Sequence, residues 1–341
     1  MVLKRFVYLG YYLKNLDWPK LSRFQRYTKE VTHRTGPLLW LDTIQSVFQY
    51  NISIEEFYSF RFFEKPKADK QEFAGTGYMY EYQLAMNPPE SRGVLEDKTQ
   101  FLRLYKDYVR HPFVTLKELE ADPKSAQRVL KHPSGKVVLK SSDGQCGRGI
   151  EVRDSKDFSP ETLIYRLHST GNDFVEAFVT QHRELMRLSP SGLNTVRVIT
   201  QLDKNDRVHI IGTRLRITVN SAVDNLAAGN IAAPIDPETG IVTGPGVYSD
   251  ITKPDEHRHP VTGVDIVGFQ VPFWQETIAM CKAAALIDTR NRSIGWDVAV
   301  TDAGPELIEG NHDWCKLLWQ LPVKRGLKPV LERFREEWEG R

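Results

Sequence analysis

The second half of the chain is dominated by short apolar runs with the length and alternation typical of β-strands. The runs are DFVEAFV (173–179), TVRVITQL (195–202), RVHIIGTRLRITV (207–219), WDVAVT (296–301) and PELIEGN (305–311). A long helix is predicted within 271–289, but most of these runs follow one another without a helix between them. This order favours antiparallel pairing and disfavours a doubly wound parallel sheet. A Rossmann fold is also disfavoured because no G-x-G-x-x-G follows a first strand.

The first 95 residues have a mainly helical pattern. In residues 43–64 the apolar positions recur at three- and four-residue steps, and Ser53 stands where it can cap a second helix. The segments EKPKADKQ (64–71) and NPPESRG (87–93) are polar and rich in turn formers, so we expect breaks there.

The middle of the chain mixes helical and strand patterns. We expect helices at 97–110, 115–122 and 160–170, with Ser159 and Gly171 as the caps of the last, and strands at 136–140 and 149–152. Together with the second half, this predicts an α+β fold with mainly antiparallel sheets, preceded by a largely helical region.

Composition excludes several classes of protein. The chain has 341 residues and a formal net charge of +2, which gives no indication of nucleic-acid binding. The three cysteines, Cys146, Cys281 and Cys315, form no metal-spaced pair and no disulfide framework, so we expect a reducing, cytoplasmic location. The longest uncharged run of the aromatic N-terminus, FVYLGYYL, is too short to span a bilayer, and no stable membrane insertion is expected.

Polar residues end the last two predicted strands. A turn at 302–304 would join these strands, so that Asp297 lies beside Glu309, and the two-residue period places Asn311 on the same face as Glu309. Two carboxylates and a carboxamide form a hard oxygen site suited to Mg²⁺. The alternative is a hairpin whose polar residues simply face solvent.

A glycine-rich turn follows the strand that ends in Lys140. The segment SSDGQCGRG (141–149) contains Gly144, Gly147 and Gly149, whose backbone amides could form an anion-binding nest beside the lysine. It lacks the Gly-Lys-Ser/Thr ending of a Walker A loop. The two interpretations are a phosphate-binding flap and a tight surface hairpin.

The order of these features resembles the ATP-grasp superfamily, whose members clasp ATP between two α+β lobes. The succession is a lysine in EDKTQF (96–101), the strand ending in Lys140, the glycine turn, Glu176 at a strand end, Asp297, and EGN (309–311). Four segments resemble the branch called sugar-transfer-associated ATP-grasp, which is associated with cell-surface polysaccharide and natural-product assembly. They are LNTVRVIT, VDNLAAGNIAAPIDPETGIV, HPVTG and GWDVAVTDAGPELIEGN.

The resemblance implies a role for each matching residue. Lys98 and Lys140 would contact the α- and β-phosphates, and Ser142, Gly144, Gly147 and Gly149 would belong to the flap. Glu176 and the backbone of Ala177, Phe178 and Val179 would hold the adenine, while Glu184 would accept from the ribose. Asp297, Glu309 and Asn311 would bind Mg²⁺.

The chain departs from related ligases at two places. Gly295 stands where many of them carry an arginine, so the cation at the reacting centre must come from elsewhere; Arg197 is the first choice and Arg214 the second. After EGN the sequence reads HDWC (312–315) instead of Ser-Pro-Gly, so we expect a different recognition of the acceptor.

Two polar loops are candidates for substrate contact. Asp224, Asn225 and Asn230 lie in a Gly/Asn-rich segment, the composition of a loop that reaches a ligand, although ordinary turn residues are the alternative. Lys253 and His257 lie in KPDEHRHP (253–260), which we interpret as a basic, substrate-facing loop, with a histidine metal site as a weaker alternative.

The resemblance predicts three regions: a helical region (1–95), an ATP-grasp N-terminal lobe with the flap (96–180), and a C-terminal lobe with the metal site (181–341). It predicts a ligase that uses ATP and Mg²⁺ to join a small carboxylate to an amine through an acyl phosphate. The alternatives are a kinase acting on a sugar-like hydroxyl and a non-catalytic ATP-binding module. A homodimer is left open.

Overall fold

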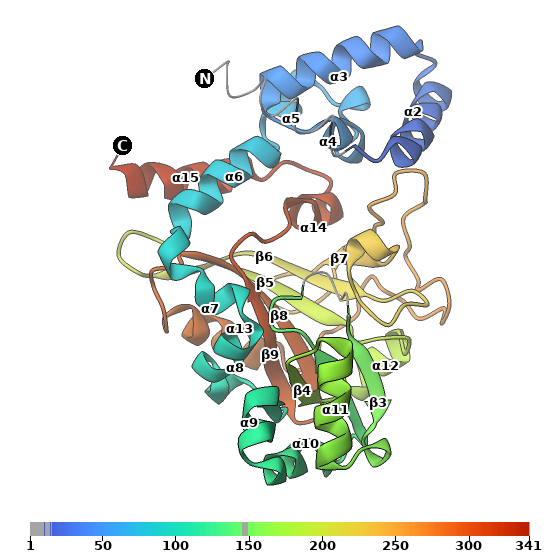
Figure 1. Cartoon of the computed structure of the whole chain (residues 1–341). Helices are drawn as coiled ribbons and strands as arrows, with labels where there is room; N and C mark the ends of the chain where they lie inside the picture. Colours follow the sequence, from blue (N-terminus) through green and yellow to red (C-terminus); the bar gives the residue numbers. More distant parts are fainter. Residues whose placement is uncertain (1–9, 11–13, 15, 145–148, 341) are drawn as a thin grey trace.

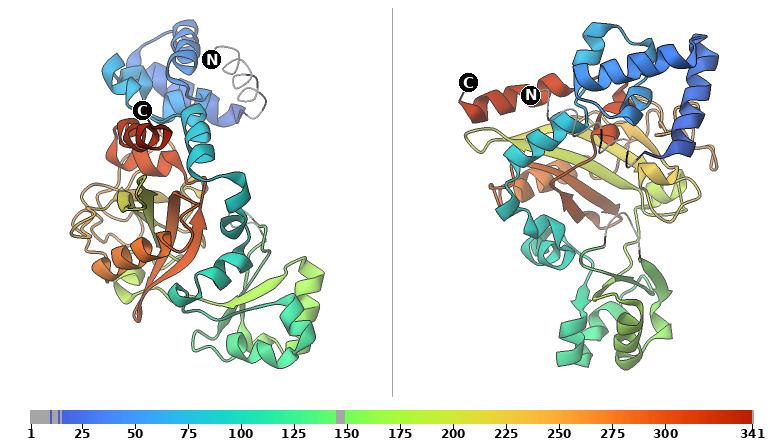
Figure 2. Two further views of the ribbon diagram at one scale, coloured as in Figure 1. Left: turned by 90° about the vertical axis from the view of Figure 1, so that its left-hand side faces the viewer. Right: turned by 45° about the horizontal axis from the view of Figure 1, so that its top comes forward.

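The computed structural model describes residues 10, 14, 16–144 and 149–340 of the chain. These residues form a four-stranded sheet, here called the small sheet, and a five-stranded sheet, the large sheet (Figure 1). The small sheet and the N-terminal helices lie at opposite ends of the molecule, with the large sheet between them (Figure 2). Among the described residues, no helix combines the length and apolar character needed to cross a membrane.

Helices surround an aromatic core in the N-terminal region. They are α2 (Trp18–Thr32), α3 (Gly36–Tyr50), α4 (Ile54–Ser59) and α5 (Lys67–Gln71). The next helices are α6 (Thr76–Met86), which packs against Trp314 and Trp319, and α7 (Gly93–Glu96). Buried rings such as Phe57, Phe62 and Phe73 form the core of this region. Ser53 caps α4 in a reciprocal capping box with Glu56, which confirms the cap predicted there.

The small sheet has the strand order β1-β4-β2-β3, and its neighbouring strands are antiparallel. Its strands are β1 (Phe113–Thr115), β2 (Lys136–Lys140), β3 (Glu151–Asp154) and β4 (Phe174–Ala177), and its helices are α9 (Leu116–Ala121), α10 (Gln127–Leu130) and α11 (Pro160–Thr170). The preceding helix α8 (Lys98–Leu104) packs through Phe101 and Leu102 in the core of the large sheet. Val137 and Leu139 of β2 pack against the helices in one core. Because side chains alternate along a strand, Val138 and Lys140 face the other way, toward the large sheet.

The large sheet has the order β7-β6-β5-β8-β9, also antiparallel. Its strands and helices are β5 (Thr195–Leu202), β6 (Val208–Ile217), β7 (Ile231–Pro234), β8 (Ser293–Thr301), β9 (Gly304–Asn311), α12 (Arg183–Leu188) and α13 (Trp274–Ala285). Val196 and Val298 belong to the core that contains Ile278 of α13. The alternation therefore places Arg197 and Asp297 on the opposite face, which carries the candidate site.

The C-terminal helices α14 (Lys316–Gln320) and α15 (Lys328–Glu339) connect the large sheet to the N-terminal region. Gln320 accepts from the amide of Ala74 at 2.9 Å and donates to its carbonyl at 3.0 Å. Lys316 forms an ion pair of 3.0 Å with the buried carboxylate of Glu56. These contacts fix the helical region on the lobe that carries the site.

The antiparallel α+β fold and the predicted strands are confirmed, but two predictions of local structure were wrong. Residues 67–71 form helix α5 instead of a break, because Pro66 starts the helix and the buried Lys70 ammonium lies over two aromatic rings of the N-terminal core. The helix expected at 97–110 ends earlier, at Leu104, where Tyr105 leaves the helical conformation and packs against Trp296.

Candidate functional site

Acidic and amide side chains come together where β8 pairs with β9. The register places Asp297 opposite Glu309 and Gly295 opposite Asn311. The Asn311 side-chain amide donates to the carbonyl of Gly295 at 3.2 Å and to Glu309 at 3.3 Å. The predicted adjacency of Asp297, Glu309 and Asn311 is therefore confirmed, while their role as metal ligands stays a prediction.

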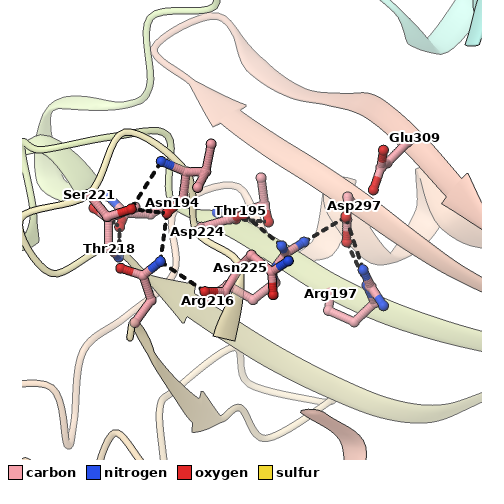
Figure 3. Close-up of polar contacts among 12 residues, drawn as sticks. Asn194, Thr195, Arg197, Arg216, Thr218, Ser221, Asp224, Asn225, Asp297 and Glu309 are labelled. Carbon is pink, nitrogen blue, oxygen red and sulfur yellow. Dashed lines mark hydrogen bonds and ion pairs between the residues drawn. The ribbon is translucent and has the colours of Figure 1, made fainter. Parts of the chain in front are cut away.

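Two arginines surround the buried carboxylate of Asp297 (Figure 3). Arg197, its register partner on β5, donates from Nε to Oδ1 at 2.5 Å and from Nη2 to Oδ2 at 3.0 Å. Arg216 of β6 donates from Nη1 to Oδ2 at 2.6 Å. Burial by itself would raise the pKa of Asp297, but the two guanidinium charges lower it well below its ordinary value.

Glu309 shows the opposite behaviour. Its burial, together with the charge of Asp297, raises the pKa of Glu309 to about 7. A divalent cation between the two carboxylates would relieve this repulsion, and the side-chain oxygen of Asn311 offers a third hard ligand. The donor set therefore fits Mg²⁺. Among the described residues no group of three or more His, Cys, Asp or Glu could hold a metal ion, so this set depends on the amide.

The structure explains why glycine occupies position 295. A Cβ built there would lie 2.6 Å from Cβ of Trp314 and 3.3 Å from Cδ of Arg197. The space that a longer side chain would need is thus filled by the indole and by the arginine of the neighbouring strand. Arg197 brings a cation to this region from β5 instead of β8.

A second charged group lies on the small sheet. Lys140 at the end of β2 forms an ion pair with Glu176 of β4. His111 is buried between two acids, 2.7 Å from Glu306 of β9 and 3.7 Å from Glu176. Burial would raise the pKa of Glu176, but the charges of Lys140 and His111 lower it to about 2. His111 thereby links the two sheets electrostatically.

Lys98 lies where the two charged groups meet. Its ammonium donates to the carbonyls of Ser141, at 3.4 Å, and Gly144. Burial lowers the pKa of Lys98; the nearby charges that act on it are led by Glu309, which raises it, and Lys140, which lowers it. The charges of Lys140 and of the candidate metal ligand Glu309 thus both reach Lys98.

The described part of the glycine turn is anchored to the small sheet. Ser142 donates to Asp173 from its amide at 2.7 Å and from its hydroxyl at 2.5 Å. Gly149 has φ +76°, with no atom within 4 Å of a built Cβ. Gly147, which we predicted in the flap, lies outside the described residues. The phosphate-binding role of Ser142, Gly144 and Gly149 stays a prediction.

The residues predicted to hold the adenine and the ribose lie in two different places. The amides of Ala177 and Phe178 donate to Pro112 and Lys136, at 2.9 and 3.0 Å, and are therefore occupied; Val179 follows them and is buried. Adenine binding by this segment stays a prediction. Glu184, predicted at the ribose, pairs with Arg187 at 2.9 Å on α12, in a surface hollow that Gln270 also lines, and its ribose role stays a prediction.

Arg214, the second choice of catalytic arginine, binds backbone carbonyls in this structure, and its catalytic role stays a prediction. Its guanidinium is buried and donates to the carbonyls of Trp319, at 3.0 Å from Nε, and Thr213, at 2.7 Å. Burial lowers the pKa of Arg214 to about 9. Through the contact with Trp319, the Arg214 side chain holds α14 against β6. The arginine that reaches Asp297 beside Arg197 is Arg216, which the sequence reasoning missed although it alternates with Leu215 in a predicted strand.

The predicted substrate residues separate into two groups. Asp224 lies at the site, 2.7 Å from Arg216, and Asn225 follows it as the cap of a short 3-10 turn. Asn230 is fully buried, and both ends of its amide bind the backbone of its own loop; its substrate role stays a prediction.

Lys253 and His257 lie on a different, exposed loop. The ammonium of Lys253 stands 4.3 Å from the ring centroid of Tyr248. None of the contacts described for this loop joins Lys253 or His257 to Asp297. Their predicted role in substrate binding remains a prediction.

Several solved structures resemble the chain at low identity. The ATP-grasp ligase PsnB, complexed with a phosphomimetic variant of its minimal precursor, Mg and ADP, has 14% identity and a TM-score of 0.43 over 77% of this chain and 65% of PsnB. D-alanyl-alanine synthetase A from Vibrio cholerae has 14% identity and a TM-score of 0.44, over 74% and 66% of the two chains. D-alanine–D-alanine ligase from Bacillus anthracis has 12% and 0.41, over 73% and 68%.

These likenesses are too distant to transfer a substrate or a residue role, and the chain spans about two thirds of the length of those proteins. None of the curated proteins matches the chain. A family model described as sugar-transfer associated ATP-grasp matches residues 78–336, which include the site from Lys98 to Asn311. ATP and Mg²⁺ are the cofactors that this assignment implies. The chain has the ATP-grasp fold and belongs to the sugar-transfer associated ATP-grasp family.

Proposed function

We propose that the protein is an ATP-dependent carboxylate–amine ligase that forms an amide through an acyl phosphate. The observation that carries the proposal is the position of Lys98, whose ammonium donates to the carbonyls of Ser141 and Gly144 in the turn after Lys140 and is influenced by the charge of Glu309 on the large sheet. A triphosphate needs cations from the protein and a bound metal at the same place. The groups that would supply both are adjacent here.

Each residue has a defined part in this proposal. Asp297, Glu309 and Asn311 would hold Mg²⁺, which when bound neutralises phosphate charge. Lys98 and Lys140 would contact phosphate oxygens as point charges. Lys140 would exchange its ion pair with Glu176 for this contact.

The reaction would proceed in two displacements. A carboxylate oxygen of the acid attacks the γ-phosphorus, the bond to the oxygen bridging the β-phosphorus breaks, and ADP leaves. An amine nitrogen then attacks the acyl carbon, the carbon–oxygen bond to phosphate breaks, and the nitrogen loses a proton. The protein contributes in-line positioning, charge neutralisation and exclusion of water from the acyl phosphate.

The test is ADP release from ATP and Mg²⁺ with a panel of small acids, in the presence and absence of amines. A ligase releases ADP and phosphate and gives an amide; without the amine, hydroxylamine traps the activated acid as a hydroxamate. Glu309→Gln should abolish turnover, and Glu151→Gln, at an ion pair on β3 outside the site, should not. Phosphate retained on a hydroxyl product would identify a kinase. Tight binding of ATP without turnover of any acceptor would indicate a regulatory module.

We also propose that the product enters cell-surface polysaccharide or natural-product assembly in the cytoplasm. The support is the family's description as sugar-transfer associated. Its test is the identity of the acid that is turned over. A sugar-linked acid supports the polysaccharide route, an acid found only in natural products supports the other route, and an acid of general metabolism contradicts both.

A further inference from the structure

The carboxylate of Asp297 has little capacity left for another partner. A carboxylate offers about four lone-pair positions, and three of those on Asp297 already accept from guanidinium groups. The two guanidinium charges would also repel a metal ion at this oxygen pair. Asp297 can therefore serve the proposed metal site fully only when one arginine withdraws.

The two arginines are not equivalent in this respect. Arg197 holds Asp297 with two parallel bonds from the register-paired position, and its side chain is 7% exposed. Such a bidentate pair is the stronger and geometrically more specific one. Arg216 makes a single bond to Asp297, and its other terminal nitrogen, Nη2, lies 2.7 Å from Oδ1 of Asp224. Arg216 can thus leave Asp297 and keep a buried counter-charge.

Asp224 is itself fixed, so it can act as a pivot (Figure 3). Its Oδ2 accepts from the amide of Thr195 at 3.0 Å and from the hydroxyl of the same residue. The loop that carries Asp224 is closed by Asn230, which accepts from the amide of Val219 at 2.8 Å and donates to the carbonyl of Asn225 at 2.9 Å. Asp224 therefore holds Nη2 of Arg216, while Nη1 can exchange Asp297 for another anion.

We propose that Arg216 is a partner-switching arginine. With the nucleotide absent it binds Asp297; with ATP present its Nη1 turns, with Asp224 as the pivot, to an oxygen of the terminal phosphate. This proposal rests on the proposed function, because it requires ATP at the site. It also supplies the cation that Gly295 cannot, since Arg216 then touches the reacting phosphate and releases Asp297 for its role as a ligand.

The competing explanation is that Arg216 only holds Asp297 in position. The two explanations predict opposite effects on metal binding. If Arg216 competes with the metal for Asp297, its removal strengthens metal binding to the nucleotide-free protein. If Arg216 positions Asp297 for the metal, its removal weakens that binding.

The first experiment measures Mn²⁺ binding to the nucleotide-free protein by electron paramagnetic resonance. In Arg216→Met the proposal predicts about tenfold tighter Mn²⁺ binding, the equivalent of one charged hydrogen bond. Arg258→Met, at an exposed ion pair with Asp265 outside the site, should leave the affinity unchanged. Equal or weaker Mn²⁺ binding in a folded Arg216→Met protein overturns the proposal.

The second experiment measures ATP and ADP binding by calorimetry in saturating Mg²⁺. Arg216→Met should weaken ATP binding about tenfold or more and change ADP binding little, because only ATP carries the terminal phosphate. Arg216→Lys should lose part of the preference for ATP, since an ammonium cannot bridge two anions as a guanidinium fork does. Asp224→Asn, which removes the charge of the pivot, should also reduce the preference.

These results separate the inference from the proposed function. If the wild type binds both nucleotides but the Arg216 variants change ATP and ADP binding equally or not at all, the switch is wrong and the ligase proposal stands. If the wild type binds neither nucleotide, both fall. Should Arg216→Met not fold, Arg216→Lys and Asp224→Asn carry the same test, because both retain hydrogen-bonding groups of similar size.

Discussion

Replacing His111 by glutamine should remove a pH dependence of the free energy of unfolding that arises from the contact between the two sheets. His111 is buried between Glu176 of the small sheet and Glu306 of the large sheet. Burial alone would lower the pKa of His111, but its hydrogen bond with Glu306 and the charges of the two acids outweigh it and raise the pKa from 6.5 to about 9. The protonated imidazole therefore stabilises the contact between the sheets.

The magnitude and sign follow from linkage. A rise of the pKa from 6.5 to about 9 corresponds to about 3 kcal/mol of folding free energy. Because the folded-state pKa is the higher one, this stabilisation is fully present below pH 6.5 and is lost as the pH rises through 9. The steepest part of the loss should approach about 1.4 kcal/mol per pH unit.

Urea unfolding of wild type and His111→Gln from pH 6 to pH 10 measures this effect as a difference between two curves. The wild type should lose about 3 kcal/mol relative to the variant across this range. His168→Gln is the matched control, because its ion pair with Glu120 is about half exposed and is expected to contribute little. Parallel stability curves for wild type and His111→Gln would show that the imidazole is not charged between the two acids.

Three further substitutions test the site. Gly295→Ala should destabilise the fold by about 1–3 kcal/mol in urea unfolding, because its Cβ meets Trp314, whereas Gly93→Ala, with open space around it, should not; equal stabilities contradict the packing explanation. In metal-free thermal unfolding above pH 7, Glu309→Gln should be more stable than wild type, because the raised pKa of Glu309 shows that its negative charge destabilises the fold at that pH. Added Mg²⁺ should stabilise only the wild type. Stabilisation of the variant by Mg²⁺ argues against Glu309 as a ligand. Arg214→Met should unfold at lower temperature with Mn²⁺ affinity unchanged; altered affinity would return Arg214 to the site.

The hairpin of the site was accessible from the sequence because its geometry is local. A short turn keeps the two strands paired, and the two-residue period of strands puts Asn311 on the face of Glu309. The pairing of Asp297 with Glu309 also needs a register shift between Asp297 and Val298, which the pattern does not specify. The strand β2 that ends in Lys140 follows in the same way from its apolar run. For such pairs the chain separation is small, and the pattern leaves few alternatives.

The arginines depend on strand order, which the local pattern does not specify. Arg216 of β6 reaches across β5 to Asp297 of β8, and this contact requires the strand order β6-β5-β8. It also depends on the β5–β6 pairing, which a register shift between Ile199 and Thr200 changes. Arg214 and Arg216 share a face by alternation, so the sequence could not tell which one contacts the acid. His111 was missed for the same reason, since its partners lie 65 or more positions away, on two different sheets.

The most direct test of the account is a crystal structure with an unhydrolysable ATP analogue and Mn²⁺ located by its anomalous signal. The account predicts one triphosphate with Lys98 and Lys140 on its oxygens and the metal bound by Asp297, Glu309 and Asn311. Metal or phosphates located elsewhere, with these five side chains remaining apart from the ligand, would contradict it.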